Sequence, residues 1–260
     1  MHISVTTLKN FINVLGIAMN GDMVITRKPN ENIIASVTNT EKRVMITAFI
    51  ANGKQVEYDV DESVEMCINE LDFKKRYLAN FDGEYVGVVT TDDVITLSDD
   101  KLTVNVPQID YEYASRSIPG KSIEDIKMSI PSREIVIAFD ADDIQKFIKV
   151  AKNLGETVVS FTIPKEGEYI YLSTEKRSKL EVHADIDNKY GKEFVVDISI
   201  NALEDSFAEA QLDITMGFVT EQTKDQYGND VLYPVTFDYV TGKNSEIDVS
   251  GLLIPHKVTW

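Results

Sequence analysis

Cysteine and basic residues are scarce in this sequence, and each shortage excludes a class of protein. The 260 residues include one cysteine, Cys67, which excludes an internal disulfide and a cysteine-rich zinc site and indicates a reducing compartment. Cys67 stands between Met66 and Ile68, so we interpret it as a small core residue and not as a nucleophile. Lysine and arginine number 26 against 43 aspartate and glutamate residues. The resulting formal charge of −17 excludes a basic protein that coats nucleic acid.

Long apolar runs are also missing. No segment approaches the ~18 to 20 consecutive apolar residues of a membrane span. The opening Met1-His2-Ile3-Ser4 lacks the basic and then apolar regions of a signal peptide. We therefore expect a cytoplasmic protein without a membrane partner. A composition of 43% hydrophobic and 27% charged residues is typical of a folded chain, and the length favours two domains over one.

Patterns that carry catalysis or bind a metal are not found. The sequence has no nucleophile elbow and no glycine-rich dinucleotide fingerprint. Gly120-Lys121-Ser122 lacks the earlier glycine of a phosphate-binding loop, because that position is Ser115. Three histidines occur, and no two have metal-ligand spacing: His2, His183 and His256. We expect no catalytic residue, no metal, no cofactor and no enzyme activity.

An internal repeat indicates a duplicated unit. Residues 8–14 (LKNFINV) have a counterpart in 144–150 (IQKFIKV), and TEKR at 40–43 recurs at 174–177. The two matches keep their order and nearly the same offset, 136 and 134 residues, which chance rarely preserves. The chain is therefore predicted to contain two copies of one domain.

The boundary between the copies is predicted at residues 107–131. Pro107, Pro119-Gly120 and Pro131 interrupt both helical and strand periodicity there, which favours an extended connector. The predicted organisation is a first domain over 1–106, a connector over 107–131 and a second domain over 132–260.

Apolar spacing predicts an α+β fold with two short helices per copy. The expected helices cover 8–15, 69–81, 144–151 and 203–210. Their predicted N-caps are Thr6 or Thr7 for the first, Asp140 for the third, and Asn201 with Glu204 for the fourth. Three β-rich segments follow each helix: 23–26, 33–37, 44–50; 85–90, 94–97, 102–106; 158–163, 169–173, 180–186; 213–220, 233–239, 246–253.

Basic residues gather on three of these helices although the protein is acidic. The third helix carries Lys146, Lys149 and Lys152 on the side opposite its apolar residues. The second and first helices add Lys74, Lys75, Arg76, Lys9 and the polar Asn13. The fourth helix is acidic, with Glu204, Asp205 and Glu209. Ordinary solvated helix faces are the alternative explanation of the lysines.

This organisation resembles the sliding clamps of DNA replication. Locally the sequence is similar to the bacteriophage T4 type of clamp in Thr6-Thr7-Leu8-Lys9-Asn10-Phe11 and over residues 140–154. Near the C-terminus, Leu252-Leu253-Ile254-Pro255-His256-Lys257 resembles the hydrophobic and proline-bearing ending of archaeal and eukaryotic clamps. The acidic fourth helix departs from the pattern of the family.

The resemblance implies a DNA-clamp fold that closes into a homotrimeric ring, with helices lining the hole and sheets outside. Such a clamp is a non-catalytic processivity factor that encircles duplex DNA, tethers DNA polymerase and is loaded by a clamp-loader ATPase. It implies a helix-face set that faces the DNA: Lys9, Asn13, Lys74, Lys75, Arg76, Lys146, Lys149 and Lys152. If a bacteriophage encodes the chain, the compartment is the host cytoplasm.

The resemblance also implies two protein-binding regions. A partner-peptide groove under the connector is expected to use Ile109, Tyr111, Tyr113, Ile118, Ile126, Leu252, Leu253, Ile254 and Pro255. The subunit interface is expected to pair two edge strands through Leu102, Val104, Val106, Leu180, Val182 and Ala184.

Two other classes stay open at this level. An acidic β-rich structural or adaptor protein without a DNA role, for example a virion component, fits the duplication and the charge equally well. A hydrolytic enzyme is disfavoured because no site for it is found. Retention on circular but not on linear DNA distinguishes a clamp from both.

Overall fold

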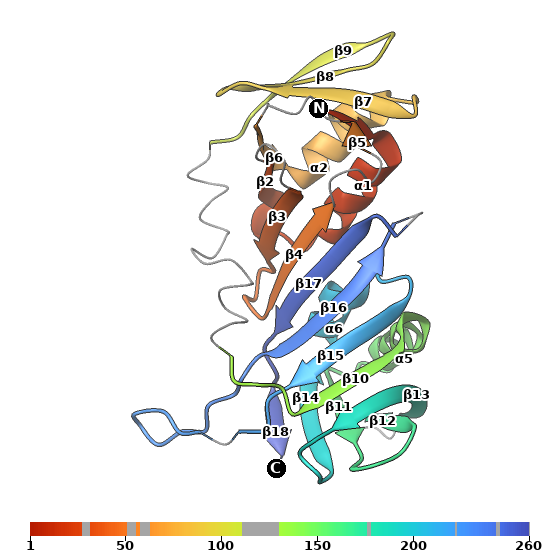
Figure 1. The fold of residues 1–260 in the computed structure, drawn as a ribbon, viewed down its shortest axis with the longest axis vertical. Helices are drawn as coiled ribbons and strands as arrows, with labels where there is room; N and C mark the ends of the chain where they lie inside the picture. Colours follow the sequence, from red (N-terminus) through yellow and green to blue (C-terminus); the bar gives the residue numbers. More distant parts are fainter. Residues whose placement is uncertain are drawn as a thin grey trace. The chain divides into compact units, whose positions relative to one another are not determined.

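The computed structural model describes residues 1–27, 32–50, 56–57, 63–110, 130–175, 178–221, 223–242 and 245–259. These residues form short helices on antiparallel strands, which confirms the predicted α+β class (Figure 1). The chain divides into unit 1, Met1–Ser122 with Val240–Val249, and unit 2, Ile123–Tyr239 with Ser250–Trp260. The predicted connector falls largely outside the described residues, which include only its positions 107–110 and 130–131.

The elements follow one another in four rounds of strand, helix and further strands. The first two rounds are β1 (His2–Ser4), α1 (Val5–Val14), η1 (Met19–Gly21), β2 (Asp22–Arg27), β3 (Ile33–Thr38), β4 (Val44–Ile50) and β5 (Val56–Glu57), then β6 (Val64–Asn69), α2 (Glu70–Asp72), η2 (Phe73–Tyr77), η3 (Leu78–Asn80), β7 (Tyr85–Thr90), β8 (Val94–Ser98) and β9 (Thr103–Pro107). The other two are β10 (Ile135–Asp140), α5 (Ala141–Asn153), β11 (Val158–Ile163), β12 (Tyr169–Ser173) and β13 (Lys179–Asn188), then β14 (Phe194–Ser199), α6 (Ile200–Phe207), β15 (Asp213–Phe218), β16 (Val235–Thr241), β17 (Ile247–Leu253) and β18 (Lys257–Thr259).

In both units, strands from the two strand–helix–strand repeats pair with each other in the same way. In unit 1 the strand before each helix pairs with the strand after the other helix, β1 with β7 and β6 with β2. In unit 2 the corresponding pairs are β10 with β15 and β14 with β11. All four pairings are antiparallel, so each unit is built from two strand–helix–strand repeats that interlock.

Of the three N-cap predictions, one is correct and two are wrong. Asp140 caps α5 as predicted, because its Oδ1 accepts a hydrogen bond of 2.8 Å from the backbone N–H of Asp142. The predicted Thr6 or Thr7 cap is wrong, since Ser4 caps α1 and accepts from the Thr7 N–H at 3.4 Å. The predicted Asn201 cap is also wrong, because α6 begins at Ile200 with Ser199 as its N-cap.

The predicted helix over 69–81 exists but is irregular. Asn69 caps it, and the helical stretch Glu70–Asn80 passes from α2 through the π-helical η2 to the 3-10 turn η3. The N–H of Leu78 donates to the carbonyl of Phe73, five residues back. This wider turn rotates the residues after it relative to a regular α-helix.

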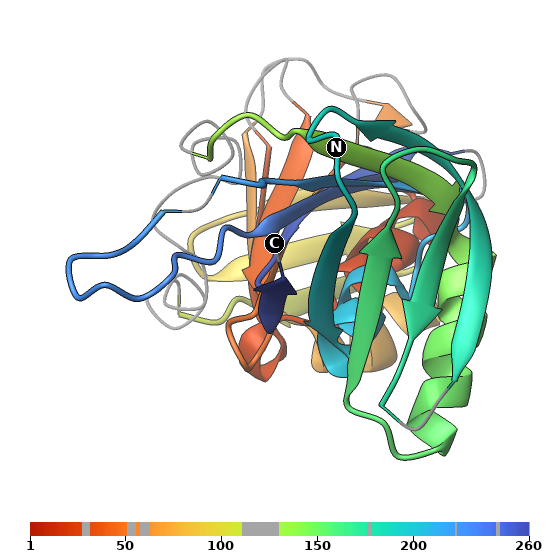
Figure 2. The ribbon, with the colours of Figure 1, turned by 90° about the horizontal axis from the view of Figure 1, so that it is seen from below.

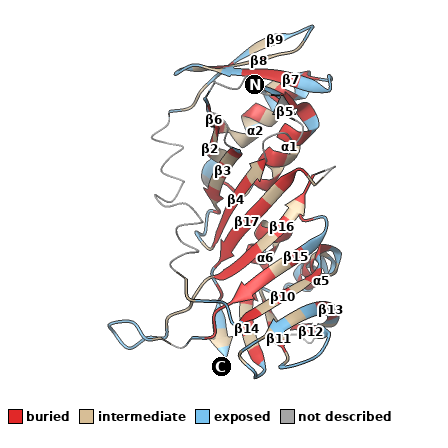
Figure 3. Cartoon of the chain, viewed as in Figure 1, coloured by how far each residue is buried: buried red, intermediate tan, exposed pale blue. Residues whose placement is uncertain are grey.

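Apolar side chains from helices and strands form the core of each unit. Leu8, Phe11 and Ile12 of α1 are fully buried, as are Ile144 of α5 and Phe207 of α6. Each side chain of this kind contributes roughly 1.5–3 kcal/mol when it leaves water. Figure 3 shows the resulting buried strands, with exposed residues along β13 and on α5. Among the described residues, no helix is long and apolar enough to cross a membrane.

Candidate nucleic-acid interface

In unit 2, α5 places its lysines on the exposed side of the helix. Ile144, Phe147 and Ile148 are buried, whereas Lys146, Lys149 and Lys152 are exposed. The helix flanks the strands of unit 2 (Figure 2). Apolar residues thus fix the helix, and its basic residues stay in water, as the amphipathic pattern predicts.

Two of these three lysines pair with carboxylates. Lys146 Nζ lies 3.5 Å from Asp142 Oδ2, one turn earlier on the same helix. Lys152 Nζ lies 2.5 Å from Glu204 Oε2 of α6 and joins the two helices. Lys149 forms no ion pair within the described part of the chain. Its charge is therefore the one most open to an external anion.

In unit 1, some of the basic helix residues also pair with carboxylates and others do not. Lys74 Nζ donates to Asn13 Oδ1 at 2.6 Å and to Glu70 Oε1 at 3.2 Å, so it links the two helical stretches of the unit. Arg76 Nε lies 3.2 Å from Asp72 Oδ1. Lys9 and Lys75 have no ion-pair partner within the described ranges.

The helices are nearly neutral while the rest of the protein is strongly acidic. The helical stretches α1, Glu70–Asn80, α5 and α6 contain seven cationic and six acidic side chains. Of the 26 basic and 43 acidic residues, nineteen and 37 therefore lie elsewhere. The helices should therefore repel DNA less than the rest of the protein does on average.

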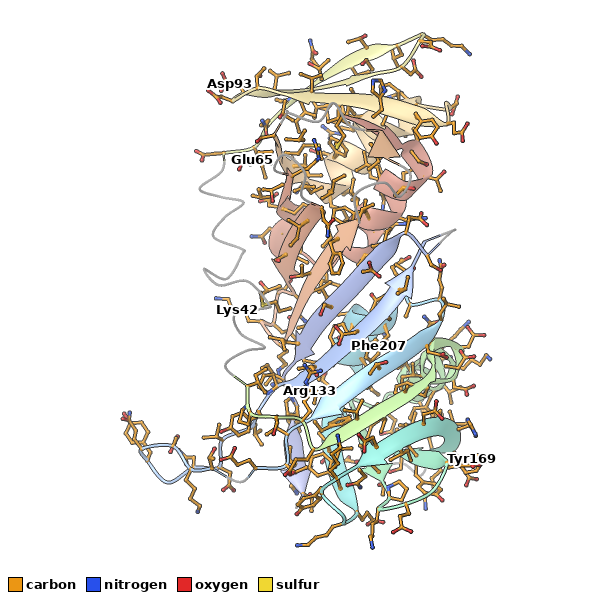
Figure 4. The ribbon with its side chains drawn as sticks, viewed as in Figure 1. Lys42, Glu65, Asp93, Arg133, Tyr169 and Phe207 are labelled. Carbon is orange, nitrogen blue, oxygen red and sulfur yellow. The ribbon has the colours of Figure 1, made fainter. Side chains whose placement is uncertain are left out.

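A groove of about 450 Å³ runs between α5 and α6. Ile148, Phe207 (labelled in Figure 4) and Ala208 form its apolar part. Its polar lining comes from Gln145, Lys149, Lys152, Asn153 and Glu204. Gln145 Nε2 donates to the carbonyls of Phe207 and Ala210, at 2.7 and 2.9 Å, and so fixes the end of α6 against α5. The groove therefore has a wall that hydrogen bonds hold together and a rim that carries charged side chains.

A second cavity, of about 590 Å³, lies in unit 1 and is acidic. Glu65 and Asp93 (both labelled in Figure 4), Asp92 and Asp110 line it together with Cys67. Burial, together with the charges of Glu65 and Asp110, raises the pKa of the Cys67 thiol to about 11. The thiol is neutral at physiological pH, which fits a core residue and not a nucleophile.

The expected partner-peptide residues fall into three groups. Ile109 packs against Val24 and Cys67, and its N–H donates to the Cys67 carbonyl at 3.0 Å. Near the C-terminus Leu252, Leu253 and Pro255 are buried and Ile254 is 39% exposed. Four lie outside the described residues: Tyr111, Tyr113, Ile118 and Ile126. Ile254 is thus the C-terminal member whose side chain is accessible in the single chain.

Among the described strands, both strands expected at the subunit interface have a free edge. β9 ends the five-stranded sheet and pairs there with β8 alone. Residues Lys179–His183 of β13 pair with β12 on one side, whereas β10 pairs with the other half of the strand, Ala184–Asn188. Leu102 is exposed, while Val106, Val182 and Ala184 are buried, and Val104 and Leu180 are intermediate.

Hydrogen bonds show which amides point to these edges. The Gln108 N–H donates to Asp93 O in β9's own sheet, and the Ala184 N–H donates to Glu168 O on the β12 side. Because successive amides of a strand alternate in direction, Val104 and Val182 bond within the chain. Thr103 and Asn105 of β9, and Glu181 and His183 of β13, direct their N–H groups to the free edges. The sequence pattern does not predict which amides point to the free edges. It also does not predict that Gln145 donates hydrogen bonds to the end of α6.

Within the described part of the chain, no group of three or more histidine, cysteine, aspartate or glutamate side chains is placed to hold a metal ion. No protein-family model matches the sequence, and no curated protein matches it.

Solved structures share this architecture over the whole chain. The proliferating cellular nuclear antigen (PCNA) of Entamoeba histolytica is 13% identical, with a TM-score of 0.71 and coverage of 98% of both chains. The PCNA of A. fulgidus, bound to the C-terminal region of FEN-1, is 15% identical with a TM-score of 0.73, covering 100% of this chain and 98% of the other. The DNA polymerase III beta chain of Streptococcus pneumoniae is 13% identical with a TM-score of 0.69, covering 99% of this chain and 64% of the other. The protein therefore has the DNA-clamp fold.

Proposed function

We propose that this protein is a sliding clamp, a non-catalytic processivity factor of DNA replication. The observation that carries the proposal is the clamp fold, which extends over 98% or more of the chain in comparison with PCNA and with a bacterial beta chain. The nearly neutral helices of an otherwise acidic protein support it, because in each unit the helices repel DNA little.

The proposed ring holds duplex DNA by enclosure. Weak and non-specific interactions between lysines and phosphates suffice, because the closed ring prevents loss of the DNA while these interactions exchange. Lys149 and the helix-face set of unit 1 would supply them. Strong pairing with particular phosphates would hinder sliding.

We infer that three copies close the ring through the free edges of β9 and of Lys179–His183 in β13. Within the described strands, each edge offers unpaired backbone groups, and pairing them with another copy removes a surface that invites aggregation. A heterologous contact of this kind generates a ring when its rotation closes.

DNA polymerase and a clamp-loader ATPase are the proposed partners, and the proposed compartment is a cytoplasm, that of the host if a bacteriophage encodes the chain. Exposed Ile254 and the start of the connector at Ile109 are the described parts of the proposed peptide site. The PCNA of A. fulgidus, which shares this fold, binds a protein segment, the C-terminal region of FEN-1.

Topological retention tests the proposal. The protein is diluted to dissociate the ring, reassembled in the presence of nicked circular DNA, and separated from free protein by gel filtration. We expect it to elute with the circle at a salt concentration that abolishes simple ionic binding. Cutting the circle once should release it.

Light scattering over a dilution series gives the oligomeric state of the same sample. A ring that stays on circles and leaves after linearisation has the proposed function. A monomer that is never retained would instead identify an acidic structural or adaptor protein.

A further inference from the structure

The pair formed by Lys152 and Glu204 differs from the other ion pairs of the helix-face set. Lys74, Arg76 and Lys146 pair with a carboxylate four residues earlier on their own helical stretch. Lys152 instead pairs with a carboxylate 52 residues away, on α6. Glu204 is thus brought to Lys152 by the packing of the two helices, at the rim of the α5–α6 groove.

We propose that Glu204 is a built-in competitor of the DNA phosphate, which occupies Lys152 when no phosphate is in the groove. A carboxylate and a phosphodiester both offer anionic oxygens to an ammonium group, so each can take the place of the other. This inference rests on the proposed function, and it gives the acidic fourth helix a role.

The geometry allows this exchange. The side chains of Lys152 and Glu204 are 41% and 46% exposed, so water screens their attraction and little is lost when they separate. Lys149 and Asn153 line the same groove, and Lys149 has no ion pair within the described residues. A phosphate that enters the groove can therefore interact with Lys149 and displace Glu204 from Lys152.

The α6 side of this groove does not need the pair for its position. Gln145 already holds the carbonyls of Phe207 and Ala210, and Leu203 and Phe207 are fully buried. Separation of Lys152 from Glu204 therefore leaves the helices in place. The consequence is an interaction with DNA that Glu204 keeps weak, so the clamp holds each phosphate only briefly.

The substitution Glu204→Gln tests the proposal because it keeps the size of the side chain and removes the competing charge. We expect the affinity for a short fluorescein-labelled duplex, measured by anisotropy at low salt, to rise about two- to fivefold. The dependence of log affinity on log salt should steepen by about one unit for each additional phosphate that the protein neutralises. Glu166→Gln is the matched control, because it breaks an exposed lysine pair, Lys165–Glu166, in the turn between β11 and β12 and changes the total charge equally.

A second pair of variants separates competition from a general charge effect. In the Lys152→Gln background, Glu204→Gln should have no more effect than Glu166→Gln, since the competed-for lysine is gone. An equal rise in affinity in both backgrounds, or no rise over the control in the wild-type background, overturns the proposal. The proposed function fails separately, if the wild-type protein neither binds the duplex in a salt-dependent manner nor stays on circles.

Discussion

At the scale of single residues, Cys67 gives a pH dependence whose sign follows from its burial. Its pKa is raised from 9.0 to about 11, so the folded protein holds the thiol proton more tightly than the unfolded chain. The contribution to stability is complete below pH 9 and is lost as the pH rises from 9 towards 11.

We therefore expect the free energy of unfolding to fall more steeply with rising pH above about pH 9 in the wild type than in Cys67→Ala. Denaturant titrations on both sides of that pH measure the difference. The alanine variant has a constant loss of stability from its missing sulfur, so only the pH-dependent part is compared. Parallel curves for the two proteins would contradict the assignment.

Ile254 carries the residue-scale prediction about partners. Ile254→Glu should reduce stimulation of the DNA polymerase from the same source at least severalfold, because a carboxylate in an apolar peptide site is left without a partner. The trimer should persist in light scattering. Val89→Glu, at an apolar side chain that is 51% exposed on β7, is the control and should stimulate normally. A charged residue at buried Leu253 would instead destabilise the core, so it would not report on partner binding.

Some interactions of these residues could be predicted from the sequence and others could not. The Lys146–Asp142 pair follows from a spacing of four on a helix. The Lys152–Glu204 pair and the Lys74–Asn13 hydrogen bond need two helices to pack, and no local pattern contains that information. The burial of Leu253 beside exposed Ile254 likewise depends on the folded unit, because residues 249–253 of β17 are all buried and Ile254 follows the end of the strand.

At the scale of elements, the free edges of β9 and β13 are the places where we propose that copies pair. Proline at an edge amide removes a donor to the next copy and leaves the strand's own ladder intact. We expect Asn105→Pro and Glu181→Pro each to convert the trimer into folded monomers, seen as a threefold smaller mass in light scattering with an unchanged circular dichroism spectrum.

Asn105→Val and Glu181→Val are the controls, since they change the same side chains and keep the amides. Both should remain trimeric. Proline at Val104 or Val182 is less informative, because those amides belong to the β8–β9 and β12–β13 pairs of the chain itself. Trimers in both edge-proline variants would show that the ring closes elsewhere.

The positions of the strands show which elements can be predicted from sequence patterns. The strands after each helix alternate clearly and are placed within a few residues, as in β11, Val158–Ile163, which is matched completely. Sequence patterns do not locate the strands before the helices, such as β6 and β14, although each of these has six residues, as β11 has. Their partners lie far away in sequence, so the exchange of strands between repeats emerges only in the folded unit.

At the scale of the whole molecule, charge is divided between the helices and everything else. The duplication and the clamp fold follow from repeats and element order, which the sequence contains. The balance of seven cationic and six acidic side chains on the helices has meaning only once the other 37 acidic residues are known to lie elsewhere. A formal charge of −17 is therefore compatible with DNA inside a ring.

The three helix lysines without an ion pair in the described residues, Lys9, Lys75 and Lys149, should carry most of the ionic interaction with DNA. Reversing all three to glutamate should weaken duplex binding and flatten its salt dependence, by about one unit of slope or less for each phosphate that is no longer neutralised. Reversing Lys165, Lys189 and Lys192 changes the total charge equally at exposed loop positions and should leave the slope unchanged. Because the helix lysines lie opposite buried residues, thermal unfolding should be nearly the same in both triple variants. Equal decreases in affinity in the two would mean that DNA responds to net charge alone, and the helices would then have no special place in its binding.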